Sequence, residues 1–405
     1  MKRTFKFRLY PTSAQAAALD WTLARCCELY NAALQERKEA WNACKRHPNF
    51  YDPVWRTEHA GEYSVHYYDQ VNALPDLKRA LRPEYATIGS HVLQDVLRRV
   101  KKTFDDFFGR VRRGQTPGYP RYQRWTHYDS FTFPDASGWK LSGHRLNITG
   151  LGSIKIKLHR PVEGTIKTTT IKREGVHWYV CFVCEVVAHP RLPVTSEAVG
   201  IDLGLLHFAT LSSGQTIENP RYLRVSEKKL AEKQQVLSRK KRGSHRRKKA
   251  ARLVGACHRH VRKQRQDFLH KQSRNLVNCY ETIIFEDLKP RNMSRRPKPK
   301  QDAGTGEFLP NGVAAKGGLN KSIHDAGWAT FVAMVRAKAE SAGHVTIVLV
   351  DPHKTSQLCS GCKREGPHKD LSERTHTCPH CGLVLDRDHN AALNILRLGL
   401  SRQAA

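Results

Sequence analysis

The sequence has no apolar run long enough to cross a bilayer, and it has few acidic residues. Its 405 residues include 37 Asp and Glu against 69 Lys and Arg, which gives a formal net charge of +32. No apolar segment follows the basic residues of the first ten positions, so we expect neither a secretory signal nor a membrane anchor. Solubility does not require so large an excess of positive charge. It favours a polyanionic partner, with nucleic acid as the first choice.

Cysteines are present, but their pattern does not indicate a disulfide scaffold. A chain of this length can build its cores without covalent cross-links, and eleven cysteines in such a chain favour a reducing compartment and a metal site. We therefore predict a cytoplasmic protein. A second pair with CxxC spacing, Cys181 and Cys184, lies in a predicted strand. Residues three apart in a strand point to opposite faces, so this pair is not expected to bind one metal ion.

Four cysteines near the end of the chain have the spacing of a zinc ribbon. Cys359 and Cys362 form one CxxC pair, fifteen residues follow, and Cys378 and Cys381 form the other. Four thiolates complete a tetrahedral shell around Zn²⁺ and leave no position for a reacting water. The spacing therefore predicts a structural zinc site.

Two regions with different hydrophobic periodicity make up the first half of the chain. Residues 2–9 alternate as a half-buried strand, and Thr12 or Ser13 can cap the helical pattern that continues to about Arg113. Short alternating runs punctuated by glycine follow, which predict a small antiparallel β-barrel or sheet with which the first strand pairs. Between the two regions, Tyr119, Tyr122 and Trp125 alternate with Arg121 and Arg124. Together with Trp178, these aromatic residues fit either base stacking or the core of the β-domain.

The second half has an unusually basic segment. Residues 221–280 contain 20 Lys or Arg and three acidic residues, at loose helical spacing, which predicts a long helical hairpin that contacts phosphates. We expect a strand at 281–288, a loop at 290–318, a helix at 323–343 and a strand at 344–350. Candidate phosphate contacts at the centre of this basic segment are Lys240, Lys241, Arg242, Arg246 and Arg247.

Three acidic residues lie beside apolar strands or at a helix start. Asp202 ends a β-run in VGIDLG, Glu286 directly follows TIIF, and Asp388 comes two residues before NAALNILRL. Taken singly, Asp388 also fits a helix N-cap and Glu286 a surface acid at a strand end. When the three acids are considered together, the N-cap and surface-acid interpretations become less favoured, because an unpaired carboxylate at a buried strand end costs free energy.

The motifs GIDLG, FEDL and DRDHNAALNI, with a four-cysteine ribbon just before the last, resemble the RuvC-like nuclease of the TnpB family. FKFRLYPTSAQ, KSIHDAGWATF and VDPHKTSQLCSGC also resemble segments of that family. The resemblance spans nearly the whole chain and implies a multidomain α+β protein with an RNase H-like (RuvC) core and an inserted zinc ribbon. It also implies a β-barrel wedge domain and a helical recognition domain. The activity implied is cleavage of DNA that matches a bound guide RNA, next to a short adjacent motif.

Domain boundaries follow from this resemblance. It implies that residues 1–12 are the first strand of the wedge domain, 13–113 the recognition domain and 114–192 the rest of the wedge. Residues 193–353 would form the nuclease core with the basic hairpin 221–280, residues 354–385 the zinc ribbon, and residues 386–405 the final catalytic helix.

Carried over residue by residue, the resemblance implies that Asp202, Glu286 and Asp388 are the catalytic carboxylates and hold two Mg²⁺ ions. Asp287 and Asp386 are their local rivals, and strand alternation allows only one of Glu286 and Asp287 to face the site. Hard carboxylate oxygens suit Mg²⁺, and two such ions suit phosphodiester hydrolysis. The helix that carries Gln94 and Arg98 would face duplex DNA.

The expected partners are a guide RNA and double-stranded target DNA, bound by a monomer. Base pairing with the guide would supply most of the sequence specificity. Three alternatives remain open from the sequence: a catalytically silent RNA-guided DNA-binding regulator, an acid-triad transposase that joins DNA ends, and a zinc-ribbon RNA-binding protein without catalysis.

Overall fold

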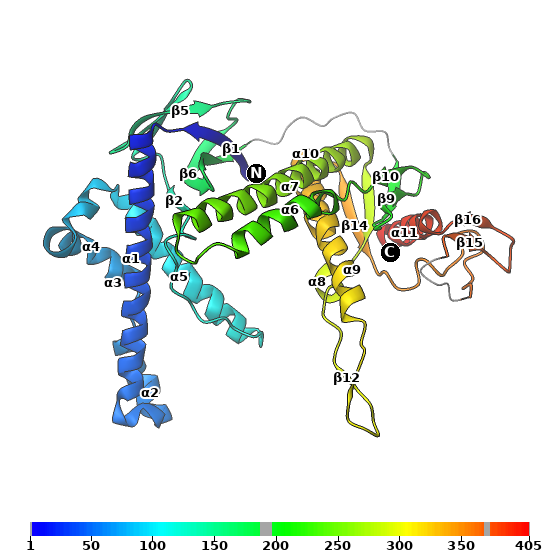
Figure 1. The fold of residues 1–405 in the computed structure, drawn as a ribbon, viewed down its shortest axis with the longest axis horizontal. Coiled ribbons are helices and arrows are strands. Elements are labelled where there is room, and N and C mark those ends of the chain that lie inside the picture. Colours follow the sequence, from blue (N-terminus) through cyan, green and yellow to red (C-terminus); the bar gives the residue numbers. More distant parts are fainter. Residues whose placement is uncertain (1, 187–196, 368–372, 405) are drawn as a thin grey trace. The chain divides into compact units, whose positions relative to one another are not determined.

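The computed structural model describes residues 2–186, 197–367 and 373–404, and the chain divides into two compact units. Unit 1 spans Met1–Val187 and unit 2 spans Ala188–Ala405. Each unit has its own hydrophobic core. Figure 1 shows the helices and strands of both units. No helix in the described ranges combines the length and apolar character that a membrane span needs.

The helices and strands of unit 1 are, in chain order, β1 (Lys2–Tyr10), α1 (Ser13–Arg46), η1 (Pro48–Tyr51), α2 (Pro53–His59), η2 (Ala60–Tyr63), α3 (Tyr67–Asn72), α4 (Leu74–Asp76), η3 (Leu77–Leu81), η4 (Pro83–Thr87), α5 (Ser90–Arg112), β2 (Ser130–Phe133), β3 (Trp139–Ser142), β4 (Arg145–Ile148), β5 (Gly152–Lys157), β6 (Thr165–Glu174) and β7 (His177–Glu185).

Unit 2 contains β8 (Ala198–Asp202), β9 (His207–Leu211), β10 (Thr216–Glu218), α6 (Tyr222–Ser238), α7 (His245–Cys279), β11 (Thr282–Glu286), α8 (Pro290–Met293), β12 (Lys300–Gln301), β13 (Phe308–Leu309), α9 (Val313–Ala326), α10 (Trp328–Ala342), β14 (Thr346–Val350), β15 (Thr375–Thr377), β16 (Val384–Asp386) and α11 (Arg387–Ala404).

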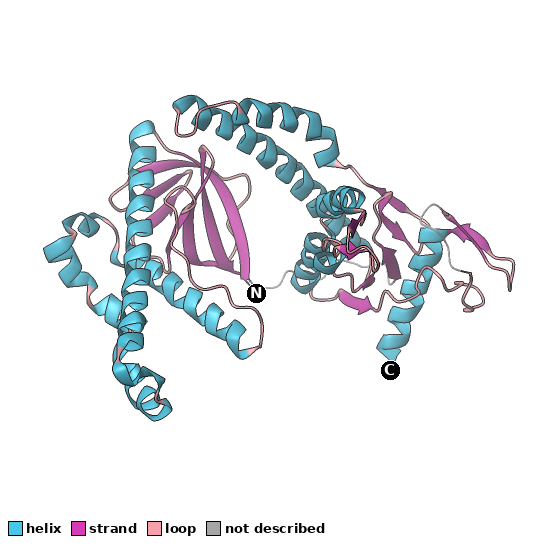
Figure 2. Cartoon of the chain, turned by 60° about the horizontal axis from the view of Figure 1, so that its bottom comes forward, coloured by secondary structure: helices cyan, strands magenta, loops and turns pink. Residues whose placement is uncertain are grey.

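The sheet of unit 1 is antiparallel, with the order β2-β6-β7-β1-β5-β4-β3. Figure 2 shows the strands of the chain in magenta and the helices in cyan. The first strand lies inside this sheet, between β7 and β5, although about 140 residues of chain separate it from β5. Phe5, Phe7 and Leu9 alternate into the core, as the period-2 pattern predicted. The hairpin β3–β4 was not predicted from the sequence. Its strands are only four residues long, too short for alternation to identify them.

Helices α1 and α5 pack on this sheet. The Thr12 side chain accepts a hydrogen bond from the backbone N–H of Gln15, and the Gln15 side chain accepts one from the N–H of Thr12, so α1 begins with a capping box. Arg99 of α5 points to the sheet. Its guanidinium donates to the Ser130 carbonyl at 2.8 Å, to Thr132 Oγ1 at 2.8 Å and to Asp95 at 3.0 Å.

Two expectations for residues 290–343 were wrong. The predicted loop 290–318 contains the short helix α8, the β12–β13 hairpin and the first turns of α9. The predicted helix 323–343 is two helices, because Gly327 has φ +72° and ends α9 before α10 begins. Glycine adopts this left-handed conformation at little cost, so it is a common helix stop.

Unit 2 is built on a five-stranded sheet with the order β10-β9-β8-β11-β14. Strands β8, β11 and β14 are parallel, whereas β9 and β10 are antiparallel to their neighbours. One face packs on α7 and α10, and the other packs on α11. Two glycines let α11 come close: a Cβ on Gly200 would lie 2.2 Å from the Ala392 carbonyl oxygen, and one on Gly399 would lie 2.4 Å from Ile284.

Candidate active site and metal centre

Strand alternation directs two acidic side chains toward α11. In β11, Ile283 and Phe285 belong to the core on the α7 and α10 side, whereas Ile284 belongs to the core under α11. Glu286 continues the face of Ile284. In β8, Gly200 and Asp202 share the α11 face in the same way, because Val199 and Ile201 point to the opposite core. Both carboxylates therefore lie at the carboxyl ends of adjacent parallel strands, on the same side of the sheet.

The third acid reaches this position from the N-terminus of α11. Asp386, the last residue of β16, accepts hydrogen bonds from the backbone N–H groups of Asp388 and His389 at 2.9 and 3.0 Å. The N-cap is therefore Asp386, and the interpretation of Asp388 as the cap is wrong. Asp388 lies in the first turn, where the helix dipole favours a negative charge. A Cβ on Gly204 would lie 4.0 Å from Asp388 Oδ2, so the glycine of GIDLG makes room for this carboxylate.

The three carboxylates interact electrostatically. Burial raises the pKa of Asp202 well above its usual value, and the negative charges of Glu286 and Asp388 raise it further. In the described part of the chain, the Asp202 carboxylate has no hydrogen bond and no ion pair. Burial also raises the pKa of Asp388, with Asp386 as the next contributor, and Arg374 opposes this shift at 3.9 Å.

Glu286, not Asp287, faces the other acids. Burial raises the pKa of Glu286, and a hydrogen bond from the Thr355 hydroxyl opposes this shift. Asp287 is exposed and lies 3.8 Å from Lys289. The alternation argument therefore held for this pair. Within the described residues, however, the three carboxylates are not gathered as closely as the ligands of a preformed metal cluster, which agrees with mutual repulsion between them.

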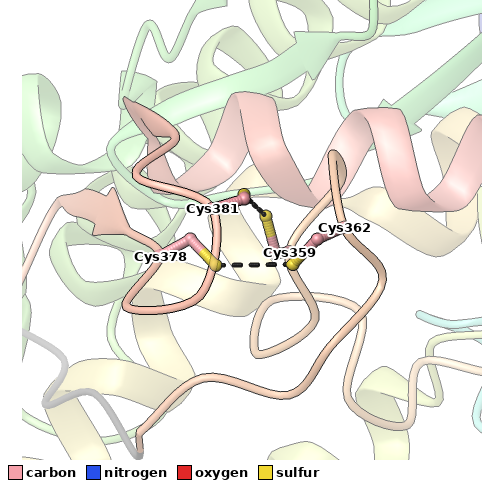
Figure 3. Close-up of side chains that lie close together, drawn as sticks. All are labelled: Cys359, Cys362, Cys378 and Cys381. Atoms are coloured by element: carbon pink, nitrogen blue, oxygen red, sulfur yellow. Dashed lines mark hydrogen bonds between the residues drawn. The ribbon is translucent and has the colours of Figure 1, made fainter.

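The four cysteines do form such a cluster. Their sulfur atoms all lie within 4.8 Å of one another, with Cys359 3.6 Å from Cys381 and Cys362 3.5 Å from Cys378 (Figure 3). Tetrahedral zinc with Zn–S bonds of about 2.3 Å places sulfurs about 3.8 Å apart, so this set fits Zn²⁺. Burial opposes ionisation of Cys378, but the backbone N–H groups of Cys381 and His380 lower the pKa of its thiol to about 6.

Both CxxC turns have the same backbone form. Lys363 and Gly382, which follow the second cysteine of each pair, have φ +65° and +70°. The N–H groups of these two residues bond the carbonyls of Cys359 and Cys378, each at 3.0 Å. Glycine adopts this left-handed conformation freely, whereas lysine adopts it only at a cost.

Asparagine side chains hold the cysteine loop on α11. Asn390 donates to the Leu358 carbonyl at 2.8 Å and accepts from the Ser360 N–H at 2.8 Å. One turn later, Asn394 donates to the carbonyls of Thr355 and Leu358 at 3.0 and 2.7 Å. Both asparagines are fully buried. The cysteine loop and the helix that carries Asp388 are thus joined by a buried hydrogen-bond network.

The candidate nucleic-acid contacts of unit 1 fall into two groups. On α5, Arg98 is exposed and Gln94 is half-buried. In the irregular segment after α5, Tyr119, Tyr122 and Trp125 are 43%, 50% and 67% exposed, and Arg121 and Arg124 are exposed beside them. The core interpretation is therefore wrong for these three aromatic residues. It is right for Trp178, which is buried in the sheet core.

The basic hairpin consists of α6 and α7 (Figure 1). Lys241, Arg242 and Arg246 are exposed near its turn, and Lys240 is half-buried there. Arg247 has a structural role instead, because its guanidinium donates to the carbonyls of Leu237 and Lys240 at 3.0 and 2.9 Å. Leu237 lies in the last turn of α6 and Lys240 in the turn that follows it, so Arg247 stabilises the connection between the two helices.

Sequence reasoning missed three contacts in this region: Thr355 with Glu286, Arg374 with Asp388, and the two asparagines with the cysteine loop. VDPHKTSQLCSGC and NAALN were noted as motifs, but nothing in a linear pattern tells which buried partner a hydroxyl or amide will find.

Comparison with known protein families gives three matches along the chain. Residues 181–296 match a family described as "Probable transposase", residues 328–395 match "Cas12f1-like, TNB domain", and residues 1–46 match "Helix-turn-helix domain". In the structure, this last segment forms the strand β1 and the single long helix α1.

Similar proteins extend over nearly the whole chain. "Putative RNA-guided DNA endonuclease" of Streptomyces pristinaespiralis is 32% identical and covers 100% of this chain and 91% of its own length. "Putative RNA-guided DNA endonuclease InsQ" of Escherichia coli is 28% identical and covers 98% and 93%. The solved structure of the mini-RNA-guided endonuclease CRISPR-Cas_phi3 aligns with 99% of this chain and 92% of its own, at 10% identity and a TM-score of 0.45. On the strength of its sequence relatives, this chain belongs to the TnpB family.

Proposed function

We propose that this chain is an RNA-guided DNA endonuclease, which hydrolyses DNA complementary to a bound guide RNA. The observation that carries the proposal is the convergence of Asp202, Glu286 and Asp388 at one edge of the unit 2 sheet, in a chain whose full-length relatives bear that name. The order of this sheet, with three parallel strands and an antiparallel second strand, supports an RNase H-like nuclease core.

The residues fit a divalent metal site. Asp202 is a half-buried carboxylate without a hydrogen-bonding or ionic partner in the described part of the chain, a costly state unless a cation compensates it. Its neighbours are further carboxylates, the hard oxygen ligands that Mg²⁺ prefers. Asp202, Glu286 and Asp388 would hold the ions. The chemistry that two bound Mg²⁺ ions supply is activation of a water and stabilisation of the departing oxygen.

The protein's own groups set up this site. The strands β8 and β11 fix the backbones of Asp202 and Glu286 side by side. Helix α11 positions Asp388 near them, and the absence of side chains at Gly200 and Gly204 leaves room for the helix and for this carboxylate. Asp386 fixes the first turn of α11, and the zinc ribbon fixes the strand that ends at Asp386. Zinc bound by Cys359, Cys362, Cys378 and Cys381 would therefore be structural.

Three surfaces are proposed to bind nucleic acid. We assign Gln94 and Arg98 on α5 to duplex DNA, and Tyr119, Arg121, Tyr122 and Arg124 to base stacking and phosphate contact. Lys240, Lys241, Arg242 and Arg246 at the tip of the basic hairpin would contact RNA phosphates. Lys38 Nζ lies 4.1 Å from the Tyr122 ring centroid and 5.4 Å from that of Tyr119, which adds positive charge to the aromatic surface.

Cleavage by the ribonucleoprotein tests the proposal. Asp202→Ala is expected to abolish Mg²⁺-dependent cleavage of matched DNA while leaving guide RNA and target binding intact. Asp287→Ala is the matched control, because Asp287 directly follows Glu286 in the sequence but is exposed to solvent. Retained cleavage by Asp202→Ala would refute the assignment, and joining of DNA ends by RNA-free protein would favour a transposase.

A further inference from the structure

The turn after β14 brings a buried hydroxyl onto one of the proposed catalytic acids. Strand β14 runs parallel to β11, with Val350 in register with Glu286. The chain then turns sharply: Lys354 has φ +60°, a left-handed conformation that is unusual for a residue with a side chain. The N–H groups of Gln357 and Leu358 both bond the Lys354 carbonyl at 3.0 Å. This turn returns Thr355 to the end of the neighbouring strand.

Thr355 has one proton to donate and two acceptors within reach. The side chain is 2% exposed. Its Oγ1 lies 2.5 Å from Glu286 Oε1 and 3.2 Å from the Pro352 carbonyl oxygen. The shorter distance falls in the range of a hydroxyl that donates to a carboxylate. The bond occupies one carboxylate oxygen, and no described residue bonds the other, so Oε2 of Glu286 can accept a metal ion or water.

The backbone of Thr355 is itself held in place. Asn394 Nδ2 donates to its carbonyl at 3.0 Å, and Asn394 lies on α11 six residues after Asp388. Thr355 therefore connects the strand that ends at Glu286 to the helix that begins beside Asp388. Its neighbour Leu358, bonded by both Asn390 and Asn394, leads directly into Cys359.

We propose that Thr355 is a positioning residue for Glu286: its hydroxyl fixes the carboxylate orientation, and its backbone fixes the distance from Glu286 to α11. This inference rests on the proposed function, since it gives Glu286 its orientation in that site. It assigns a role to the VDPHKTSQ segment, which neither the zinc ribbon nor the acid triad accounts for.

The test compares Thr355→Val, which keeps the shape and removes the donor, with Thr355→Ser, which keeps the donor. The valine variant is expected to lower kcat for target cleavage by about 10- to 100-fold, the usual cost of losing a group that orients a ligand, with little change in KM for target DNA. The valine variant is also expected to weaken Mn²⁺ binding to the nucleic-acid-free protein by about 10- to 100-fold, as measured by Mn²⁺ EPR. The serine variant should restore both to within about threefold of wild type, and zinc content should be unchanged in each.

A double variant separates positioning from packing. In an E286A background, Thr355→Val is expected to add no further loss of Mn²⁺ affinity, because the group it orients is gone. If the valine variant loses its zinc or no longer melts cooperatively, Thr355→Ala is used instead, and the same losses of kcat and Mn²⁺ affinity are expected. Wild-type Mn²⁺ affinity in Thr355→Val, an equal loss in Thr355→Ser, or an undiminished loss in the double variant would each overturn the inference. The proposed function fails by a different result, namely cleavage by E286A alone.

Discussion

The position of Asp202 suits a metal ligand but lowers the stability of the metal-free fold. Its pKa is raised because burial and two neighbouring carboxylates disfavour the charged form. A carboxyl group whose pKa is higher in the folded than in the unfolded state binds its proton more tightly when folded. Its stabilising contribution is therefore present below the unfolded pKa near 3.8 and is lost as the pH rises through the folded pKa. At neutral pH without divalent ions, Asp202 therefore destabilises the fold, because it must either keep a charge that its surroundings disfavour or take up a proton.

We therefore expect Asp202→Asn to abolish cleavage, by more than about 100-fold, and also to raise the melting temperature in magnesium-free buffer at pH 7. A gain of about 1 kcal/mol corresponds to about 2–4 °C for a unit of this size. No chelator is added, so that the zinc site stays loaded. Asp287→Asn, at the exposed neighbouring acid, should leave the melting temperature unchanged. A lower melting temperature in Asp202→Asn would contradict the electrostatic account.

Adjacent arginines on α5 have different roles. Arg99 bonds Asp95, the Ser130 carbonyl and Thr132, whereas Arg98 is exposed on the same helix. Arg99→Met is expected to destabilise unit 1 by about 2–4 kcal/mol, because it removes several charge-assisted hydrogen bonds and leaves Asp95 unpaired. Arg98→Met should change stability by less than about 0.5 kcal/mol and weaken DNA binding. Urea denaturation of both variants measures the difference, and equal effects on stability would contradict the structure.

Sequence patterns predicted what depends on local chemistry. Strand alternation allowed only one of Glu286 and Asp287 to face the other acids, the family resemblance favoured Glu286, and the CxxC spacing located all four sulfur atoms of the cluster. The alternative that Asp388 is the N-cap was wrong, because Asp386 and Asp388 are both acids at a helix start and only the backbone geometry shows that Asp386 is the cap. Thr355 could not be found at all: its partner lies 69 residues earlier, and the sheet topology alone brings the two together.

At the scale of whole elements, the sequence predicted which helices are present better than it predicted where they begin and end. The loose helical spacing of residues 221–280 correctly predicted helices α6 and α7, and their excess of 20 Lys or Arg over three acidic residues is the basis for the proposed phosphate contacts. The aromatic residues after α5 could not be assigned from sequence, because Tyr and Trp fit both a core and a stacking surface. The break between α9 and α10 was visible only as a single glycine, which a helix also tolerates at a cost of about 1 kcal/mol.

The tip of the basic hairpin should act on RNA through charge. Each phosphate contact changes log affinity by about 0.7 per log unit of salt on a single strand and about 0.9 on a duplex. Replacing Lys241, Arg242 and Arg246 together by Gln is therefore expected to lower the slope of log Kd for guide RNA against log salt by about 2–3. Arg247→Gln is the control. Because Arg247 bonds carbonyls in the last turn of α6 and in the turn that follows it, this substitution should lower helix content or melting temperature and leave the slope nearly unchanged.

At the scale of the molecule, the two units divide the proposed work. Unit 1 joins a seven-stranded sheet to the helices α1 and α5 in one continuous core. Unit 2 contains the acids, the cysteine cluster and the basic hairpin. Its sheet holds the acids, but α11 must stay docked for Asp388 to reach them, and the cysteine loop is bonded to α11 through Asn390 and Asn394. Stability of the metal centre and geometry of the acids are thus coupled within unit 2.

The distribution of tryptophan allows this division to be tested in the intact protein. Six of the seven tryptophans lie in unit 1 (Trp21, Trp41, Trp55, Trp125, Trp139 and Trp178), and Trp328 lies in unit 2. Cys378→Ser should abolish zinc binding and lower the melting temperature of unit 2 by about 4–8 °C, for a loss of about 2 kcal/mol, when unfolding is followed by circular dichroism. The transition followed by tryptophan fluorescence should shift by less than about 1 °C, because unit 1 buries its own core.

Cys181→Ser, in the CxxC pair of β7, should keep the zinc and affect only the fluorescence transition. Equal shifts of both transitions in Cys378→Ser would show that zinc supports one fold that includes both units, and the division would then be wrong.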